Sequence, residues 1–125
     1  MPVKRGEIYW VEFDPVKGSE QSGLRPALVV QNDIGNRYSP TTVVVAITSA
    51  IPPKPYPFMV VIAPAESGLP AVSAVNCSQM ATIHQSGDES RLRPPRGANQ
   101  LRPIGQLGDS KMEEVARALQ FNLAL

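Results

Sequence analysis

Polar residues stand at the ends of the apolar segments of this chain, where a folded scaffold could hold reactive groups. Arg25 opens one such segment and Asn32 closes it, Thr48 and Ser49 close the next, and Gln79 follows a third. A guanidinium can bind two phosphate oxygens at once, and a threonine hydroxyl can donate a hydrogen bond to an oxyanion or leaving group. This set suits cleavage of a phosphodiester that brings its own nucleophile, as RNA does with its 2′-hydroxyl. Residue types alone still favour the simpler interpretation, that these are ordinary surface polar groups.

Sequence motifs for other chemistries are absent from the chain. It has no GxxxxGKS/T or GxGxxG phosphate-binding loop, no HExxH, and no paired cysteine and histidine spacing. With one histidine, His84, and one cysteine, Cys77, a histidine-rich metal centre and an internal disulfide are excluded. A serine-histidine-aspartate triad would have to use His84, and no serine lies in an elbow motif. We therefore expect no metal and no cofactor, with His84 a partly exposed strand-end residue and Cys77 a small buried side chain.

Length and composition indicate one globular domain over residues 1–125. Apolar residues make up 42% of the chain, yet no apolar run approaches the roughly 18 residues that span a membrane. The first ten residues, MPVKRGEIYW, lack the apolar core of a secretory signal, so we expect a cytoplasmic protein. The net charge of +1 is too small for indiscriminate binding to nucleic acid. Four arginines lie between residues 90 and 108 without an acid, and a solvated basic loop explains them more simply than an anionic partner.

Apolar runs with alternating or β-branched residues predict a series of short strands. The helical spacing of apolar residues from Met112 to Leu123 predicts one helix, and Ser110 has the capping-box spacing to Glu113. This order predicts a mainly β fold, a small curved antiparallel sheet or barrel with a C-terminal α-helix packed on it. Residues 32–40 and 51–57 are predicted as turns or loops, and the Pro/Arg-rich segment of about 86–103 as a loop too polar for the core. The strands are predicted at residues 7–13, 26–32, 41–48, 58–64, 71–76 and, as a short sixth, 78–83.

An ordered series of motifs fills the first half of the chain. It comprises KRGEIYWV, GSEQSGLRP, VVQND, NRYSPT and AITS, and the last residues, MEEVARALQFNLAL, add a matching terminal helix. In these residues the chain resembles the MazF/PemK (Kid) family of toxin endoribonucleases. The resemblance implies an SH3-like small antiparallel β-barrel of the MazF/CcdB type that works as a homodimer. It also implies cleavage of single-stranded RNA, chiefly mRNA, at short motifs without a metal, leaving 2′,3′-cyclic phosphate or 3′-phosphate and 5′-hydroxyl ends.

The resemblance also gives roles to individual residues. It makes Arg25, the arginine of GLRP, the main catalytic residue and Thr48, in AITS, its partner. It implies a cognate antitoxin of the MazE type, whose disordered tail covers the RNA groove. The residues expected to bind RNA are Ser19, Glu20 and Gln21 in a loop that closes over it, Gln79, which helps to read bases, and the strand-end residues Asn32 and Ser49.

The chain departs from the family pattern in its second half. Where family members commonly have Glu-Gln-Ile-Arg-Thr, this sequence has Ser78-Gln79-Met80-Ala81-Thr82, so the glutamine is kept while the acid and the arginine are lost. The resemblance therefore leaves the base preference open. The segment of about 86–103 is longer and richer in Pro and Arg than usual, and a tolerated surface insertion is favoured over a contact with RNA or antitoxin.

Few aromatic side chains are candidates for stacking on RNA bases. Tyr9, Trp10 and Phe13 lie in a predicted strand and are expected in the core. Tyr38 and Tyr56 lie in predicted loops and are better candidates, although packing within its own proline-rich loop would also account for Tyr56.

Two other functions stay open on this fold. A DNA gyrase poison of the CcdB type shares the barrel, but its inhibition relies on C-terminal residues of the helix, and the GLRP and AITS motifs argue for a ribonuclease instead. A non-catalytic binding module would have kept the barrel and lost the activity, and the presence of both Arg25 and Thr48 argues against it. The sequence assigns neither the cleavage motif nor the general base, for which Glu20 is the nearest acid.

Overall fold

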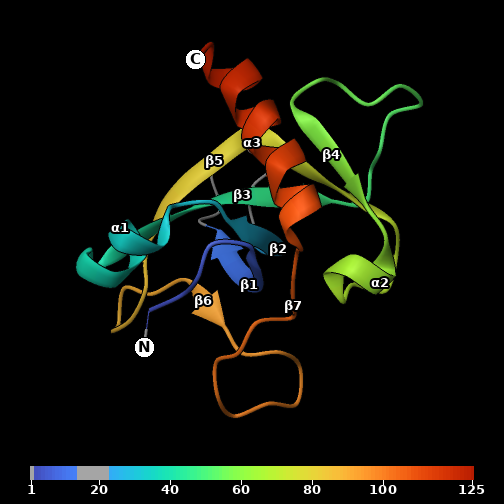
Figure 1. The fold of residues 1–125 in the computed structure, drawn as a ribbon. Helices are drawn as coiled ribbons and strands as arrows, with labels where there is room; N and C mark the ends of the chain where they lie inside the picture. Colours follow the sequence, from blue (N-terminus) through green and yellow to red (C-terminus); the bar gives the residue numbers. More distant parts are fainter. Residues whose placement is uncertain (1, 14–22) are drawn as a thin grey trace.

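One antiparallel sheet with a helix across it dominates the structure, a computed structural model that describes residues 2–13 and 23–125 (Figure 1). The strands follow the spatial order β4-β5-β3-β2-β1-β6, and β7 also pairs with β1. This confirms the predicted mainly β fold with a C-terminal helix. The elements are β1 (Glu7–Phe13), β2 (Gly23–Val29), α1 (Asp33–Tyr38), β3 (Thr41–Thr48), β4 (Met59–Ile62), α2 (Pro64–Ser67), β5 (Ser73–His84), β6 (Leu92–Arg93), β7 (Gly105–Gln106) and α3 (Asp109–Leu123).

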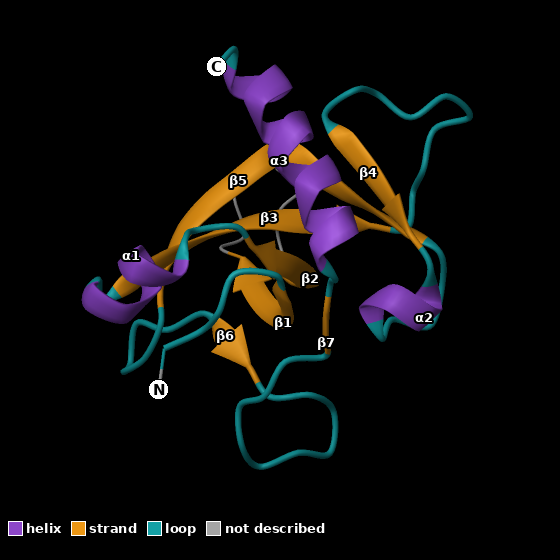
Figure 2. Ribbon diagram, in the orientation of Figure 1, coloured by secondary structure: helices purple, strands orange, loops and turns teal. Residues whose placement is uncertain are grey.

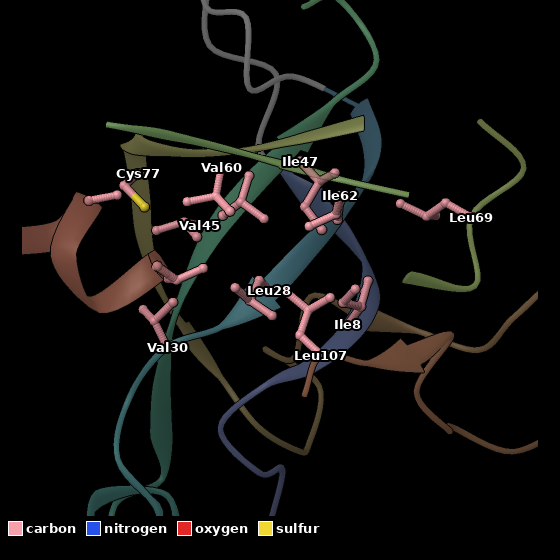
Figure 3. Close-up of a cluster of buried hydrophobic side chains, with 13 residues drawn as sticks. Ile8, Leu28, Val30, Val45, Ile47, Val60, Ile62, Leu69, Cys77 and Leu107 are labelled. Atoms are coloured by element: carbon pink, nitrogen blue, oxygen red, sulfur yellow. The ribbon is translucent and has the colours of Figure 1, made fainter. Parts of the chain in front are cut away.

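Apolar side chains fill the space between the sheet and α3 (Figure 3). Neighbouring residues of a strand point to opposite faces, so Ile8 and its cross-strand partner Leu28 enter this core, while Tyr9 points to the other face. The helix contributes Val115 and Ala118, which are both buried. Within the described part of the chain, no helix has the length and hydropathy needed to cross a membrane.

A second core cluster lies on the other face of the same strands. It contains Tyr9 and Phe13, as the sequence predicts, and Trp10 packs from β1 against the first cluster. Because both faces of β2 and β3 are covered, these two strands form a rigid base for the residues at their ends. The members of the second cluster are Val3, Tyr9, Val11, Phe13, Ala27, Val29, Val44, Ala46, Ile83 and Leu92.

The strand boundaries agree with the prediction at β1 and β3 and differ at β2 and at β4, which spans Met59–Ile62 rather than residues 58–64 because Pro64 begins α2. β2 begins three residues before the predicted start, because Leu24, Arg25 and Pro26 already pair with β1. It also ends at Val29, so Asn32 lies beyond the strand rather than at its last position. Arg25 is therefore an internal strand residue, with a backbone fixed by its neighbours, and not a residue of the preceding loop.

The predicted fifth and sixth strands form one twelve-residue strand, β5. The expected break after Asn76 is wrong: there the register with β3 jumps from Val45 opposite Met80 to Ala46 opposite Asn76. Residues 77–79 are left over in this jump and form a β-bulge. The polar residues at 76 and 78, which suggested the end of a strand, lie at a bulge within a single strand.

Two short helices were not predicted. The predicted turn at residues 32–40 is wrong, because residues 33–38 form the helix α1. Asn32 caps this helix: its Oδ1 accepts a hydrogen bond of 2.8 Å from the backbone N–H of Gly35. α2 carries Pro64 in its first turn, a position that needs no backbone donor. Residues 51–57 form the predicted loop between β3 and β4 (Figure 2).

The Pro/Arg-rich segment is tied to the sheet by β6, which pairs with β1. Its Leu92 is 5% exposed and belongs to the second core cluster, so the expectation that residues 86–103 are too polar for the core is wrong at this position. The neighbouring Arg93 lies at the surface and pairs with Glu12, with 3.0 Å between Nε and Oε1. One buried leucine thus anchors an otherwise polar segment.

The terminal helix is confirmed, but its start differs from the prediction. Its N-cap is Gly108, no side chain caps it, and Ser110 already lies inside the helix, so the predicted capping box does not form. Met112 and Leu119 pack against the first core cluster, while Leu123, predicted on the same face, is exposed. The last turn of α3 therefore extends beyond the edge of the core.

Candidate functional site

Arg25 and Thr48 come together on neighbouring strands. β2 and β3 pair with Ala27 opposite Ala46, and extending that register by two residues sets Arg25 opposite Thr48. Directly opposed residues of an antiparallel pair point to the same face of the sheet. Both side chains are partly buried. Strand register therefore sets Arg25 and Thr48 side by side on one face of the sheet.

Two hollows of the surface adjoin at this pair. The larger has a volume of about 860 Å³ and the smaller about 290 Å³, and Arg25 and Thr48 line both. The larger is also lined by Ala50, Ile51, Pro52, Tyr56, Phe58, Met59, Asn76, Ser78 and Gln79. The smaller is also lined by Trp10, Leu24, Pro26, Ile47, Ser49, Leu69, Pro70, Ala71 and Ser73.

Arg25 provides the one charged side chain among the described residues that line the two hollows. A guanidinium stays protonated at physiological pH, and its planar fork of N–H donors fits two oxygens of a phosphate. Pairing with Val11 on β1 fixes the backbone of Arg25 from the other side. The described lining thus offers a localised positive charge between two otherwise uncharged depressions.

The Thr48 hydroxyl is oriented by the backbone that follows it. Its Oγ1 accepts a hydrogen bond of 3.0 Å from the N–H of Ala50. A hydroxyl that accepts one hydrogen bond still has its own hydrogen to donate. Thr48 can therefore present a donor to an oxygen atom bound next to Arg25.

The β-bulge of β5 carries Gln79 to the rim of the larger hollow. The Oδ1 of Asn76 accepts hydrogen bonds from the backbone N–H of Ser78, at 3.0 Å, and from its hydroxyl, at 2.6 Å. These two bonds stabilise the bulge just before Gln79. The structure therefore places the predicted Gln79 near Arg25 and Thr48, supported by a hydrogen-bonded turn.

The same bulge is held from two sides at Cys77. Its N–H donates to the carbonyl of Phe58 at 2.9 Å, and its carbonyl accepts from Nδ2 of Asn122 in α3 at 3.1 Å. Sequence reasoning missed the supporting residues Asn76, Ser78 and Asn122. The available signal was a pair of polar residues around a small apolar one inside a strand-like segment, which indicates a bulge as readily as a strand end.

The other predicted RNA-binding residues fall in three places. Ser49 is exposed and lines the smaller hollow. Asn32, the cap of α1, lies near the start of β3, about 20 Å along that strand from Thr48 at roughly 3.3 Å per residue. The structure does not bring Asn32 to either hollow and gives it a structural role. The predicted loop residues lie outside the described part of the chain: Ser19, Glu20 and Gln21.

The single histidine and the single cysteine take no part in the lining of the two hollows: His84 lies away from Arg25 and Thr48, and Cys77 is buried. His84 ends β5 opposite Thr41, lines neither hollow, and contacts Glu89 with 3.1 Å between Nε2 and Oε2. Cys77 is buried as predicted, and burial raises the pKa of its thiol to about 11, so it carries little thiolate at neutral pH. Over residues 2–13 and 23–125, no group of three or more histidine, cysteine or acidic side chains is placed to hold a metal ion.

Comparison with known proteins gives a consistent result. Endoribonuclease EndoA of Bacillus subtilis strain 168 is 43% identical over 125 residues, which cover all of this chain and 97% of the relative. An endoribonuclease of a mycobacterial species, solved in complex with its cognate antitoxin, has a TM-score of 0.72 at 24% identity and covers 98% of this chain and 96% of its own. MazF from Deinococcus radiodurans has a TM-score of 0.71 at 25% identity, with 100% and 99% coverage.

The sequence also matches one protein family over nearly its whole length. Residues 4–123 match the family described as the PemK-like, MazF-like toxin of type II toxin-antitoxin systems. This range contains every element of the sheet and all of α3. The sequence match and the fold agree, and the chain belongs to the PemK-like, MazF-like family of toxins.

Proposed function

We propose that this protein is an endoribonuclease toxin that cuts single-stranded RNA, chiefly mRNA, at short motifs without a metal ion. The observation that carries the proposal is the register that sets Arg25 beside Thr48 where two hollows adjoin. An RNA chain could lie across both hollows with one phosphate at this point. The names of the relatives support the activity, since EndoA of Bacillus subtilis is called an endoribonuclease.

In this mechanism the substrate supplies the nucleophile. The ribose 2′-oxygen attacks the adjacent phosphorus, the bond between phosphorus and the 5′-oxygen breaks, and a 2′,3′-cyclic phosphate and a 5′-hydroxyl result. Arg25 binds the non-bridging oxygens and stabilises the charge of the pentacoordinate transition state. Thr48 donates to the same phosphate or protonates the leaving 5′-oxygen. The group that accepts the 2′-proton is not assigned, and Glu20, the nearest acid in the sequence, lies outside the described residues.

Base recognition in this proposal belongs to the larger hollow. Gln79 offers an amide that can both donate to and accept from a base edge, and Ser78 and Asn76 lie beside it. Ala81, where relatives of this family commonly have an arginine, packs against the second core cluster and lines neither hollow. We therefore place recognition on residues 76–79 and expect the base preference of this protein to depend on them.

The proposed partners are a second copy of the chain and an antitoxin of the MazE type. The mycobacterial endoribonuclease was solved with its cognate antitoxin, and the family is one of type II toxin-antitoxin systems. An antitoxin that occupies the hollows beside Arg25 would block access of RNA. We propose the cytoplasm as the site of action, because mRNA is found there. Because β6 pairs with β1 and buries Leu92, we limit the proposed tolerated surface insertion to residues 94–103 of the Pro/Arg-rich segment.

Cleavage of a long single-stranded RNA by the purified protein in the presence of EDTA tests the proposal. We expect fragments with 5′-hydroxyl ends, which polynucleotide kinase labels without prior phosphatase treatment. Sequencing these ends gives the cleavage motif. Fragments with 5′-phosphates, or cleavage that stops when EDTA is added, would contradict the mechanism.

A parallel assay of DNA supercoiling by gyrase separates the alternative functions. Intact RNA together with inhibition of supercoiling would indicate a gyrase poison of the CcdB type. Intact RNA without inhibition would indicate a non-catalytic binding module. Our proposal requires cleaved RNA and unaffected gyrase.

A further inference from the structure

The loop between β3 and β4 carries two stacked aromatic rings into the larger hollow. The ring centroids of Tyr56 and Phe58 are 5.1 Å apart, and their planes differ by 7°. Both residues line the hollow together with Arg25 and Thr48. Phe58 packs against the first core cluster, whereas Tyr56 is 55% exposed. Phe58 therefore supports the Tyr56 ring from the protein side, and much of the Tyr56 ring is open to a ligand.

The position of this ring pair is fixed by the backbone around it. Tyr56 stands between two prolines, Pro55 and Pro57, which restrict the backbone on either side of it. Its carbonyl accepts a hydrogen bond of 2.9 Å from the N–H of Met59, where β4 begins. The ring is thus held in place before any ligand arrives, which lowers the entropic cost of binding to it.

The ring pair is also coupled to the bulge that presents Gln79. The carbonyl of Phe58 accepts a hydrogen bond of 2.9 Å from the N–H of Cys77, the residue two positions before Gln79. The lining of the hollow therefore combines a flat aromatic surface, amide and hydroxyl groups, and the charge of Arg25. A ligand that combines flat rings, polar ring edges and negative charge matches these three kinds of group, and a nucleotide has these properties.

We propose that the ring of Tyr56 stacks on an RNA base adjacent to the phosphate bound by Arg25, with Phe58 as its support. The inference rests on the proposed endoribonuclease function and adds a substrate-binding residue to it. Aromatic stacking tolerates every base, because each base has a flat face. Tyr56 therefore contributes affinity and alignment of the RNA, while sequence preference stays with the hydrogen-bonding groups near Gln79.

Substitutions at Tyr56 and at a control tyrosine test the stacking contact. Tyr56→Leu keeps apolar bulk without a ring, and Tyr56→Phe keeps the ring without the hydroxyl. We expect Tyr56→Leu to raise KM for RNA by roughly 5-fold to 150-fold, the range for loss of one base-aromatic stack, with kcat unchanged. Tyr56→Phe restores the KM of the wild type. The matched control is Tyr38→Leu, since Tyr38 is 76% exposed on α1, lines neither hollow, and leaves KM unchanged.

An abasic scan identifies the base that contacts the ring. The probe is an RNA oligonucleotide that spans the mapped cleavage site, carries a 2′-deoxyribose at the attacking position, and has one base removed at a time. For one position next to the cut, we expect base removal to weaken binding by the wild type and to have no further effect in Tyr56→Leu. At all other positions, the losses of binding caused by base removal and by Tyr56→Leu are expected to add.

The outcomes separate the inference from the function on which it rests. Wild-type protein that leaves RNA intact overturns both. Wild-type protein that cuts RNA while Tyr56→Leu cuts it with unchanged KM overturns the stacking contact alone. Additive effects at every abasic position also overturn it, because they show that Tyr56 acts on binding without touching a base. A single non-additive position beside the cut supports it.

Discussion

Arg25 and Thr48 both line the two hollows that adjoin at the ends of β2 and β3, and the register of these strands, continued two residues past its last pair, sets them opposite each other. Their neighbours along the strands, Ala27 and Ala46, are fully buried. The backbone positions of Arg25 and Thr48 are therefore set by two strands that are packed on both faces. Such a pair is positioned before RNA binds, and it needs no movement of the sheet to reach one phosphate.

Removing the Thr48 hydroxyl tests its contribution to cleavage. Thr48→Val keeps the shape of the side chain but loses the donor, and we expect kcat for RNA cleavage to fall by about 10²-fold to 10³-fold, as for loss of one donor to an oxyanion. Thr48→Ser keeps the hydroxyl and is expected to retain most of the activity. The lost hydrogen bond to Ala50 lowers the free energy of unfolding by only about 1 kcal/mol. Single-turnover cleavage and urea unfolding of both variants check this, and unchanged kcat in Thr48→Val would show that the hydroxyl takes no part.

The hydrogen bond from Asn122 to the bulge predicts an effect of α3 on RNA binding. Asn122→Ala removes the donor to the carbonyl of Cys77, and we expect the free energy of unfolding to fall by about 1 kcal/mol. Because the bulge then loses one of its two anchors, Gln79 is held less firmly and KM for RNA rises. Gln120→Ala, at an exposed position of the same helix, is the matched control and leaves KM as it is. Equal KM values in the two variants would mean that the bulge keeps its shape without Asn122.

The backbone of Ser67 lies so close to Gly105 that a single added methyl group is expected to lower the free energy of unfolding strongly. A Cβ at Gly105 would lie 2.2 Å from the carbonyl oxygen of Ser67 in α2, which precedes Leu69 and Pro70 of the smaller hollow. We expect Gly105→Ala to lower the free energy of unfolding by about 3 kcal/mol. Gly108→Ala meets nothing within 4 Å and, as a change at the N-cap, is expected to cost about 1 kcal/mol or less. Urea unfolding curves compare the two, and equal stabilities would contradict this packing of α2 against β7.

The buried thiol of Cys77 predicts a dependence of stability on pH. Its pKa is about 11 in the folded protein, above the usual value of about 8.5 for an exposed thiol. The unfolded chain loses this proton first as pH rises, so the free energy of unfolding falls between about pH 8.5 and pH 11, by at most about 1.4 kcal/mol per pH unit. Below about pH 8.5 the thiol contributes no such dependence.

Cys77→Ala provides the comparison for this pH dependence. Tyr9, whose pKa is raised by burial and by its hydrogen bond to Glu7, titrates in both proteins, so its contribution cancels. We expect the difference in unfolding free energy between wild type and Cys77→Ala to be constant from pH 6 to about pH 8.5 and to fall above it. A constant difference up to pH 10 would show that the Cys77 thiol is not shifted.

Much of this arrangement could be predicted because strand patterns are local. The alternation in β1 and the β-branched run of β3 define those strands to the residue. Consecutive strands usually pair, so Arg25 and Thr48 could be expected near one another. Their direct opposition depends on register, which is set by packing on both faces of the sheet and cannot be obtained from either strand alone.

The features that were missed depend on contacts with residues outside the segment itself. Residues 33–38 have a turn-like composition, yet buried Asn36 accepts a hydrogen bond of 2.6 Å from Thr42 and donates one of 3.0 Å to the carbonyl of Gln31, and these bonds favour the helix. The bulge before Gln79 is supported in a similar way by Asn122 of α3. Each of these contacts joins a segment to residues outside it, so the composition of the segment does not show it.

The rate of RNA cleavage by Arg25→Ala tests the central claim most directly. Measured with the mapped RNA site under single-turnover conditions in EDTA, the variant is expected to cut at least about 10²-fold more slowly than the wild type, because the transition-state charge loses its main stabilising group. Arg25→Lys keeps the charge without the planar fork and is expected to recover little of the loss. Unfolding curves that match the wild type show that the fold is intact. Cleavage by Arg25→Ala within a few-fold of the wild-type rate would contradict the assignment of Arg25 as the catalytic residue.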